Sequence, residues 1–118
     1  MAAKDELGRR GEDVAVRYLE DRGLVVLSRN WRCRDGELDV VCTDRDRLVV
    51  CEVKTRSGTR YGPPAEAVTP RKAARIRRLA QQWLAAHHVR WCSVRFDVVA
   101  VLAPPGEPVT VQHYEAAF

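Results

Sequence analysis

Two runs of strand-forming residues separated by a short polar turn constrain the fold of this chain more than any other feature of its sequence. The runs lie at about residues 37 to 43 and 47 to 54, are rich in Val, Leu and Cys, and flank the polar pair Arg45 and Asp46. This pattern is typical of a β-hairpin. Because a two-residue turn at Arg45 and Asp46 fixes which residues face each other, the sequence also predicts the register.

The predicted register gathers charged side chains on the hairpin. Asp39 would lie opposite Glu52, and Glu37 would lie opposite Lys54. Residues two apart on a strand share a face, so these four would form one polar cluster on an otherwise apolar hairpin. Facing carboxylates repel each other and are costly to bury, so we expect a divalent metal ion to compensate them. The alternative is an ordinary Glu37–Lys54 ion pair with Asp39 in water.

The same residues resemble a known nuclease signature. Asp39 followed by Glu52-Val53-Lys54 is similar to the Asp…Glu-x-Lys core of the PD-(D/E)xK nuclease superfamily, which includes restriction endonucleases and archaeal Holliday-junction resolvases. Leu38 stands where the superfamily has its namesake proline. A longer series of motifs resembles the YraN family of small bacterial proteins: Gly-Arg-Arg-Gly-Glu-Asp at 8 to 13, Arg-Asn-Trp-Arg at 29 to 32, Gly-Glu-Leu-Asp at 36 to 39, Glu-Val-Lys-Thr-Arg at 52 to 56, Pro-Ala-Glu-Ala-Val at 64 to 68 and Arg-Phe-Asp-Val-Val at 95 to 99.

This resemblance implies a restriction endonuclease-like fold and metal-dependent hydrolysis of phosphodiester bonds in DNA, with branched DNA as one candidate substrate. Asp39, Glu52 and the main-chain carbonyl of Val53 would bind Mg²⁺ or Mn²⁺, which prefer oxygen ligands. Lys54 would orient the attacking water or stabilise the charge that develops on phosphorus. Paired cuts across a DNA junction need two active sites, which would make the protein a homodimer.

Two further acidic residues have alternative roles. The resemblance makes Glu12 a third acidic group of the catalytic site, whereas its position alone is that of a solvated helix residue beside the packed side. Asp97 lies near the start of an expected central strand, where we expect a structural role. The alternative is that Asp97 orients Arg95, or that it holds residues of the site in place without contacting the substrate itself.

Periodicity predicts a single α/β domain over residues 1 to 118, with a mixed five-stranded sheet flanked by two helices in the order α-β-β-β-α-β-β. The fourth strand would lie parallel to the Glu-x-Lys strand, because a helical crossover joins them. Gly8 and Gly11 weaken the first helix, and close approach to the sheet or to a ligand would account for them. The expected elements are a helix at 5 to 22, a strand at 24 to 29, the hairpin, a helix from the Thr69-Pro70 cap to about 88, and strands at 93 to 102 and 109 to 114.

Basic residues are concentrated after the hairpin. From Lys54 to Arg78 there are eight Lys or Arg and one acidic residue, Glu66, in a chain of net charge +4. Such a segment favours contact with phosphate. The alternative function is therefore a nucleic-acid-binding module that keeps the nuclease fold without catalysis. The candidate nucleic-acid contacts are Arg56, Arg60, Arg71, Lys72, Arg75 and Arg78.

The cysteines and the hydropathy favour a cytoplasmic protein that does not cross a membrane. The four cysteines show no C-x-x-C spacing, so we expect reduced thiols, with a Cys42–Cys51 disulfide as the alternative. No apolar run approaches the roughly 20 residues of a membrane span. The first residues lack the apolar region of a secretion signal.

Overall fold

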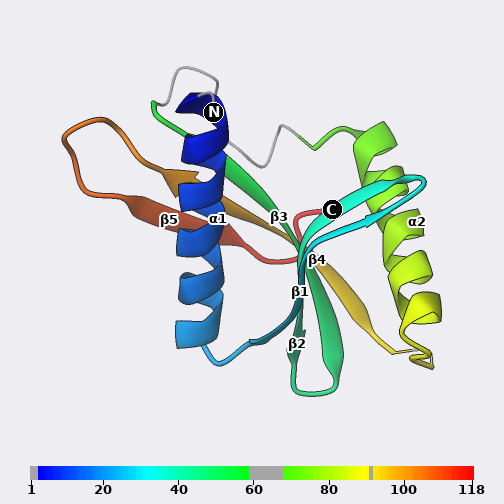
Figure 1. Cartoon of the computed structure of the whole chain (residues 1–118). Coiled ribbons are helices and arrows are strands. Elements are labelled where there is room, and N and C mark those ends of the chain that lie inside the picture. The colour runs from blue at the N-terminus through cyan, green and yellow to red at the C-terminus, as the bar shows by residue number, and fades with distance from the viewer. Residues whose placement is uncertain (1–2, 59–67, 91) are drawn as a thin grey trace.

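The computed structural model describes residues 3–58, 68–90 and 92–118, which form one mixed five-stranded sheet with a helix on each face (Figure 1). The strand order is β1-β2-β3-β4-β5, and only β3 and β4 pair in parallel. The α/β class, the element order and this parallel pairing agree with the prediction. The elements are α1 (Ala3–Asp21), β1 (Val25–Cys33), β2 (Gly36–Asp44), β3 (Arg47–Arg56), α2 (Pro70–Ala86), β4 (Val94–Leu102) and β5 (Thr110–Tyr114).

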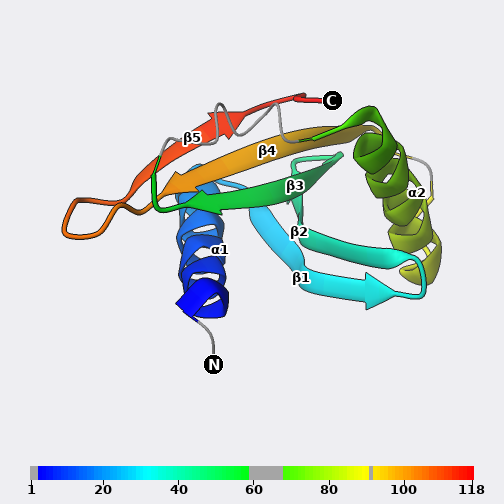
Figure 2. The same ribbon diagram turned by 90° about the horizontal axis from the view of Figure 1, so that it is seen from above.

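The turn between β2 and β3 has the predicted register, but the pairing of these strands is shorter than predicted. It begins at Asp44–Arg47 and ends at Val40–Cys51. Beyond Val40, β2 stays paired with β1 and the two strands bend away from β3 as a ribbon (Figure 2). The expected ladder pairs of Asp39 with Glu52 and of Glu37 with Lys54 are therefore wrong, because the strands fork before reaching them.

The fork also changes the face on which Leu38 lies. Strict alternation predicts that Leu38 shares a face with Val40. Instead, Val40 packs in the apolar cluster under α1, whereas Leu38 packs in the cluster under α2. A strand that twists out of its sheet loses the alternation, so the pattern of β2 cannot be extrapolated past the bend.

Each helix begins or ends at the residue that local chemistry favours. Gly23, with a φ of 92°, follows the end of α1 as predicted. Thr69 caps α2, its hydroxyl accepting the main-chain N–H of Lys72 at 3.1 Å, and Pro70 is the first helical residue. The helix ends at Ala86, two residues before the predicted end.

The two helices pack on opposite faces of the sheet. Gly11 lies so close to β3 that a Cβ atom would overlap the Thr55 side chain, whereas a Cβ atom at Gly8 would meet none of the described residues within 4 Å. The close approach predicted for α1 is thus confirmed at Gly11. Buried residues of α1 are Gly11, Ala15, Val16 and Leu19, and those of α2 are Ala73, Ile76, Leu79, Ala80, Trp83 and Leu84.

All four cysteines carry free thiols, so the Cys42–Cys51 disulfide is not formed. Neither helix, over the residues that the structure describes, has the length and apolar character needed to cross a membrane.

Candidate active site

Asp39 lies at the fork between β2 and β3, where its carboxylate takes the place of a missing ladder partner. Its Oδ2 accepts the main-chain N–H of Val53 at 2.9 Å. Burial, and next the negative charge of Glu52, raise the pKa of Asp39 to about 7, although the Val53 hydrogen bond acts in the opposite direction. An acidic side chain whose anion is this unfavourable is a typical partner for a cation.

Glu52 lies on the face of β3 toward α2, where it is only 9% exposed. Its Oε1 lies 2.7 Å from the Nζ of Lys72 and 3.5 Å from the Nζ of Lys54. We call these three residues the Glu52 cluster. The cluster joins β3 to the first turn of α2.

The two lysines of the Glu52 cluster have opposite pKa shifts. Burial, together with the neighbouring Lys72, lowers the pKa of Lys54. Burial also acts to lower the pKa of Lys72, but its hydrogen bond to Glu52, its contact with Lys54 and the charges of Glu52 and Asp39 together outweigh burial and raise it. A half-buried lysine with a lowered pKa on the strand next to a carboxyl with a raised pKa, here Lys54 and Asp39, is a combination found at catalytic sites.

A cleft of about 820 Å³ opens beside Asp39 on the α1 side of the sheet. It is bounded by the first half of α1, the β1–β2 ribbon and the end of β3, and its lining includes Glu12, Asp39 and Val53. The charge of Glu12 adds to the forces that raise the pKa of Asp39. Glu52 and Lys54 are not among the cleft-lining residues, whereas Val53 between them is, and the charge of Glu52 acts on Asp39 at the cleft wall.

Glu12 is held by two residues of β1. The side-chain amide of Asn30 donates to Glu12 Oε1 at 2.6 Å, and Arg29 Nη2 lies 3.2 Å from the same oxygen. Asn30 has a φ of 50° within the strand, a conformation that non-glycine residues seldom adopt. The structure thus gives the Arg-Asn-Trp-Arg motif a contact that its sequence did not reveal.

Glu37 does not join the Glu52 cluster, contrary to the prediction. It forms an ion pair of 2.6 Å with Arg32 on the neighbouring strand β1, although it also lines the cleft. The reason is the fork, which keeps Glu37 beside β1 and takes it away from β3.

The predicted nucleic-acid contacts divide into two groups. Arg71, Arg75 and Arg78 are exposed on α2, as a surface contact requires. Lys72 instead turns inward to Glu52, and Arg56 is partly buried. Arg60 lies outside the described residues.

A metal site built on Asp39 and Glu52 would have two carboxylates. Within residues 3–58, 68–90 and 92–118, no three or more His, Cys, Asp or Glu side chains are grouped closely enough to hold a metal ion. The remaining ligands would therefore come from main-chain carbonyls, water or substrate. The oxygen donors of the two acids suit Mg²⁺ or Mn²⁺ in their chemistry.

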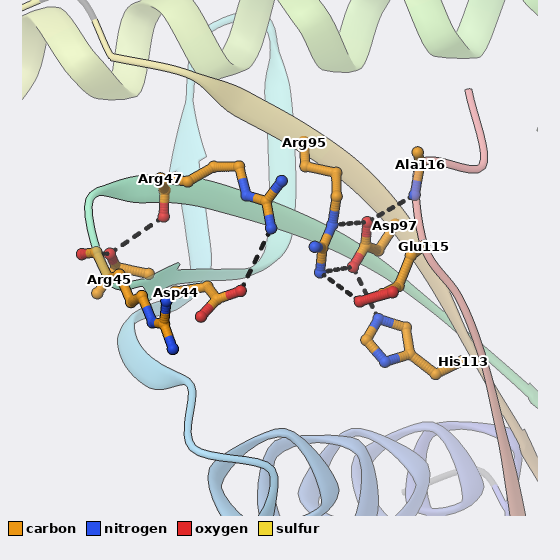
Figure 3. A network of polar contacts seen from close by, with 9 residues as sticks. Asp44, Arg45, Arg47, Arg95, Asp97, His113, Glu115 and Ala116 are labelled. Carbon is orange, nitrogen blue, oxygen red and sulfur yellow. Dashed lines mark hydrogen bonds and ion pairs between the residues drawn. The ribbon is translucent and has the colours of Figure 1, made fainter.

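A separate polar network fixes β5 and the C-terminal residues to β4 (Figure 3). Asp97 is fully buried and accepts two hydrogen bonds of 2.9 Å from Arg95, one of 3.0 Å from the Ala116 N–H, and a contact of 2.7 Å with His113 Nε2. Arg95 also pairs with Glu115 at 3.1 Å. Asp97 thus both orients Arg95 and joins β4 to the chain end, as a structural residue does.

Comparison with known proteins gives a family without an assigned activity. The model of the "Uncharacterised protein family UPF0102" matches residues 11–101. A UPF0102 protein of Frankia alni is 63% identical over 118 residues, covering 100% of this chain and 98% of the relative. A UPF0102 protein of Kineococcus radiotolerans is 60% identical over 114 residues, covering 96% and 93% of the two chains, and one of Nocardia farcinica is 50% identical over 115 residues, covering 98% and 91%.

Proposed function

The chain belongs to the uncharacterised protein family UPF0102, and for this member we propose metal-dependent hydrolysis of phosphodiester bonds in DNA. The proposal includes a restriction endonuclease-like fold and membership of the PD-(D/E)xK superfamily. It is supported by the Asp…Glu-x-Lys spacing, by the mixed sheet between two helices, and by the position of Asp39 and Glu52 at the fork of β2 and β3.

The observation that carries the proposal is the electrostatic conflict between Asp39 and Glu52. Burial and the Glu52 charge raise the pKa of Asp39 to about 7, so at neutral pH its anion is only partly stabilised by the protein itself. Lys54 and Lys72 lie beside Glu52, whereas Asp39 has no ion pair among the described residues, so an ionised Asp39 is costly for stability alone. Binding of a divalent cation accounts for it.

The residues have distinct roles in the proposed reaction. Asp39, Glu52 and the carbonyl of Val53 would hold Mg²⁺ or Mn²⁺, with Glu12 as a contact through water. When bound, the ion would supply a water of lowered pKa and polarise the scissile phosphate. Lys54, whose pKa is lowered by burial, would orient that water or stabilise the charge that develops on phosphorus.

The exposed arginines of α2 are the proposed contacts to the DNA backbone. Arg71, Arg75 and Arg78 lie on the same helix as Lys72, which contacts Glu52, so a duplex along α2 would pass close to the site. Branched DNA and a homodimer with paired active sites remain part of the proposal, as does a location in the cytoplasm, where bacterial DNA lies.

The test is cleavage of labelled linear and branched DNA by the pure protein with Mg²⁺ or Mn²⁺. We expect metal-dependent nicking that falls by at least about a hundredfold in Asp39→Asn and Glu52→Gln, because each removes a proposed ligand. Arg71→Ala is the control for correct folding and for the amount of protein in the assay. It should reduce DNA affinity more than turnover. Equal cleavage by the wild type and both acid variants would contradict the proposal.

The second candidate is a nucleic-acid-binding module without catalysis. The exposure of three arginines on one helix supports it independently of the acidic residues. DNA binding that persists without metal, together with absence of Mn²⁺ binding and of cleavage, would favour this candidate over the nuclease.

A further inference from the structure

Lys72 stands out because the sequence places it on the basic face of α2 but the structure pairs it with an acidic residue of the site. Its Nζ lies 2.7 Å from Glu52 Oε1, closer than the 3.5 Å of Lys54. The side chains of Lys72 and Glu52 are 29% and 11% exposed, so the pair is partly shielded from water. Such a charge-assisted contact is stronger than an exposed ion pair.

The four charges around the fork balance each other in this arrangement. Asp39 and Glu52 contribute two negative charges when ionised, and Lys54 and Lys72 contribute two positive charges. The charge of Asp39 also helps to raise the pKa of Lys72, so Lys72 interacts electrostatically with both acids. Both lysine contacts are made to Glu52 Oε1, so a divalent cation that binds through this oxygen would take the place that the Lys72 ammonium now holds.

We propose that Lys72 is the internal counter-cation of the metal site, held by Glu52 when no metal is bound and displaced when a divalent ion takes that oxygen. This inference rests on the proposed function, because it needs the metal site. It makes Lys72 a positioning residue that competes with the metal, in contrast to a metal ligand or a plain DNA contact. Displacement frees an ammonium group of α2 next to the bound ion, where a phosphate oxygen of the substrate can take over as its partner.

The position of Lys72 in α2 gives this competition a defined geometry. The main-chain N–H of Lys72 donates to the Thr69 cap, which fixes its backbone, whereas its ammonium group is held by the contact with Glu52. Arg71 precedes it in the same turn but is exposed and, among the contacts of the described residues, has no ion pair with Glu52. Arg71 is therefore a matched control that carries the same charge on the same helix.

Calorimetric titration of Mn²⁺ into the full chain tests the inference without any activity measurement. We expect Lys72→Met to tighten Mn²⁺ binding by about tenfold, because no ammonium has to be displaced. Lys72→Gln, which keeps a hydrogen-bond donor and removes the charge, should tighten it similarly and guards against loss of folding in the Met variant. Lys72→Arg should restore wild-type affinity, and Arg71→Met should change it by less than about twofold, since removal of a distant charge acts only through screened solvent.

The outcomes separate the inference from the proposed function. Mn²⁺ binding by the wild type that is unchanged or weaker in both Lys72→Met and Lys72→Gln would overturn the role of Lys72 and leave the metal site standing. Equal tightening in Arg71→Met would also overturn it, because a general charge effect would then suffice. Absence of Mn²⁺ binding in the wild type and in all Lys72 variants would overturn both, whereas binding that appears only in the Met and Gln variants would support the inference.

Discussion

Asp39 is the residue whose surroundings are least compatible with a purely structural role. It accepts the N–H of Val53 at 2.9 Å, yet burial and the Glu52 charge still raise its pKa to about 7. At pH 7 its neutral and ionised forms are therefore about equally populated in the folded protein without metal. The sequence identified Asp39 and Glu52 from their types and spacing, but their relation through a fork was not visible in it.

The raised pKa of Asp39 predicts how stability depends on pH in metal-free protein. The folded pKa of about 7 lies above the unfolded value of about 4, so its contribution is present below pH ~4 and is lost as the pH rises through ~7. We expect the free energy of unfolding to fall over this window by at most about 4 kcal/mol relative to Asp39→Asn. Urea denaturation at several pH values measures it, and parallel profiles for the two proteins would contradict the prediction.

Asp97 should show the opposite dependence. Burial would raise its pKa, but hydrogen bonds from His113 and Arg95 and the N–H of Ala116 outweigh burial and lower it. Its contribution is therefore present above the unfolded pKa of about 4 and is lost as the pH falls below that value.

The Asp97→Asn variant tests the strength of this network. We expect it to lose about 3 kcal/mol at pH 7, because Arg95 keeps its charge in a buried place without a full partner. Its stability should then change less than that of the wild type when the pH is lowered from 5 to 3. Chemical denaturation at these pH values measures both effects, and a variant as acid-sensitive as the wild type would show that another group controls acid unfolding.

At the scale of elements, the packing of α1 on β3 depends on one glycine. Gly11 lies against the Thr55 side chain, whereas a Cβ atom at Gly8 would have open space around it among the residues that the structure describes. We expect Gly11→Ala to destabilise the protein by about 1–3 kcal/mol, because overlap with a β-branched side chain outweighs the gain in helix propensity. Gly8→Ala should instead be neutral or stabilise by up to about 1 kcal/mol. Thermal unfolding of both variants checks this, and equal effects at the two positions would contradict it.

The elements themselves were largely predictable from local signals. The pair Arg45 and Asp46 fixed the hairpin register, and the Thr69-Pro70 cap fixed the start of α2, because each depends on chemistry within a few residues. The early end of the β2–β3 pairing was not predictable. At that point β2 stays paired with β1, and the sequence Leu38-Asp39-Val40 contains no Gly or Pro that would mark a bend. The contact of Lys72 with Glu52 was missed for a related reason, since helix periodicity says nothing about which strand the first turn approaches.

At the scale of the whole molecule, the two faces of the sheet differ in charge: the α1 side carries both acidic and basic side chains, and the start of α2 on the other side carries exposed basic ones. The cleft on the α1 side is lined by acids together with Arg9, Arg29 and Arg32, whereas the exposed charges at the start of α2 are basic. Composition alone gave a net charge of +4, which indicates an anionic partner but not a surface. In the proposed function, the exposed arginines make α2 the surface that would meet a phosphate backbone.

Salt dependence of DNA binding tests this choice. Replacing Arg75 and Arg78 with Ala should make the slope of log K against log salt shallower by about 2, because each lost phosphate contact removes roughly 0.9 from the slope. The matched control replaces the exposed Arg10 and Arg17 of α1 and should leave the slope almost unchanged. Fluorescence anisotropy with a labelled duplex at several salt concentrations measures both, and equal slopes for the two double variants would place the DNA elsewhere.

The hydrogen bond between Val53 and Asp39 turns a backbone amide into a spectroscopic reporter. The amide proton of Val53 points at a carboxylate whose ionisation is centred near neutral pH, so its resonance should move downfield as that carboxylate loses its proton. In an isotope-labelled sample, the amide cross-peak of Val53 would therefore report the protonation state of the Asp39 carboxyl. Adding a diamagnetic ion such as Mg²⁺ should abolish that titration, so a single NMR signal reads out cation occupancy without substrate.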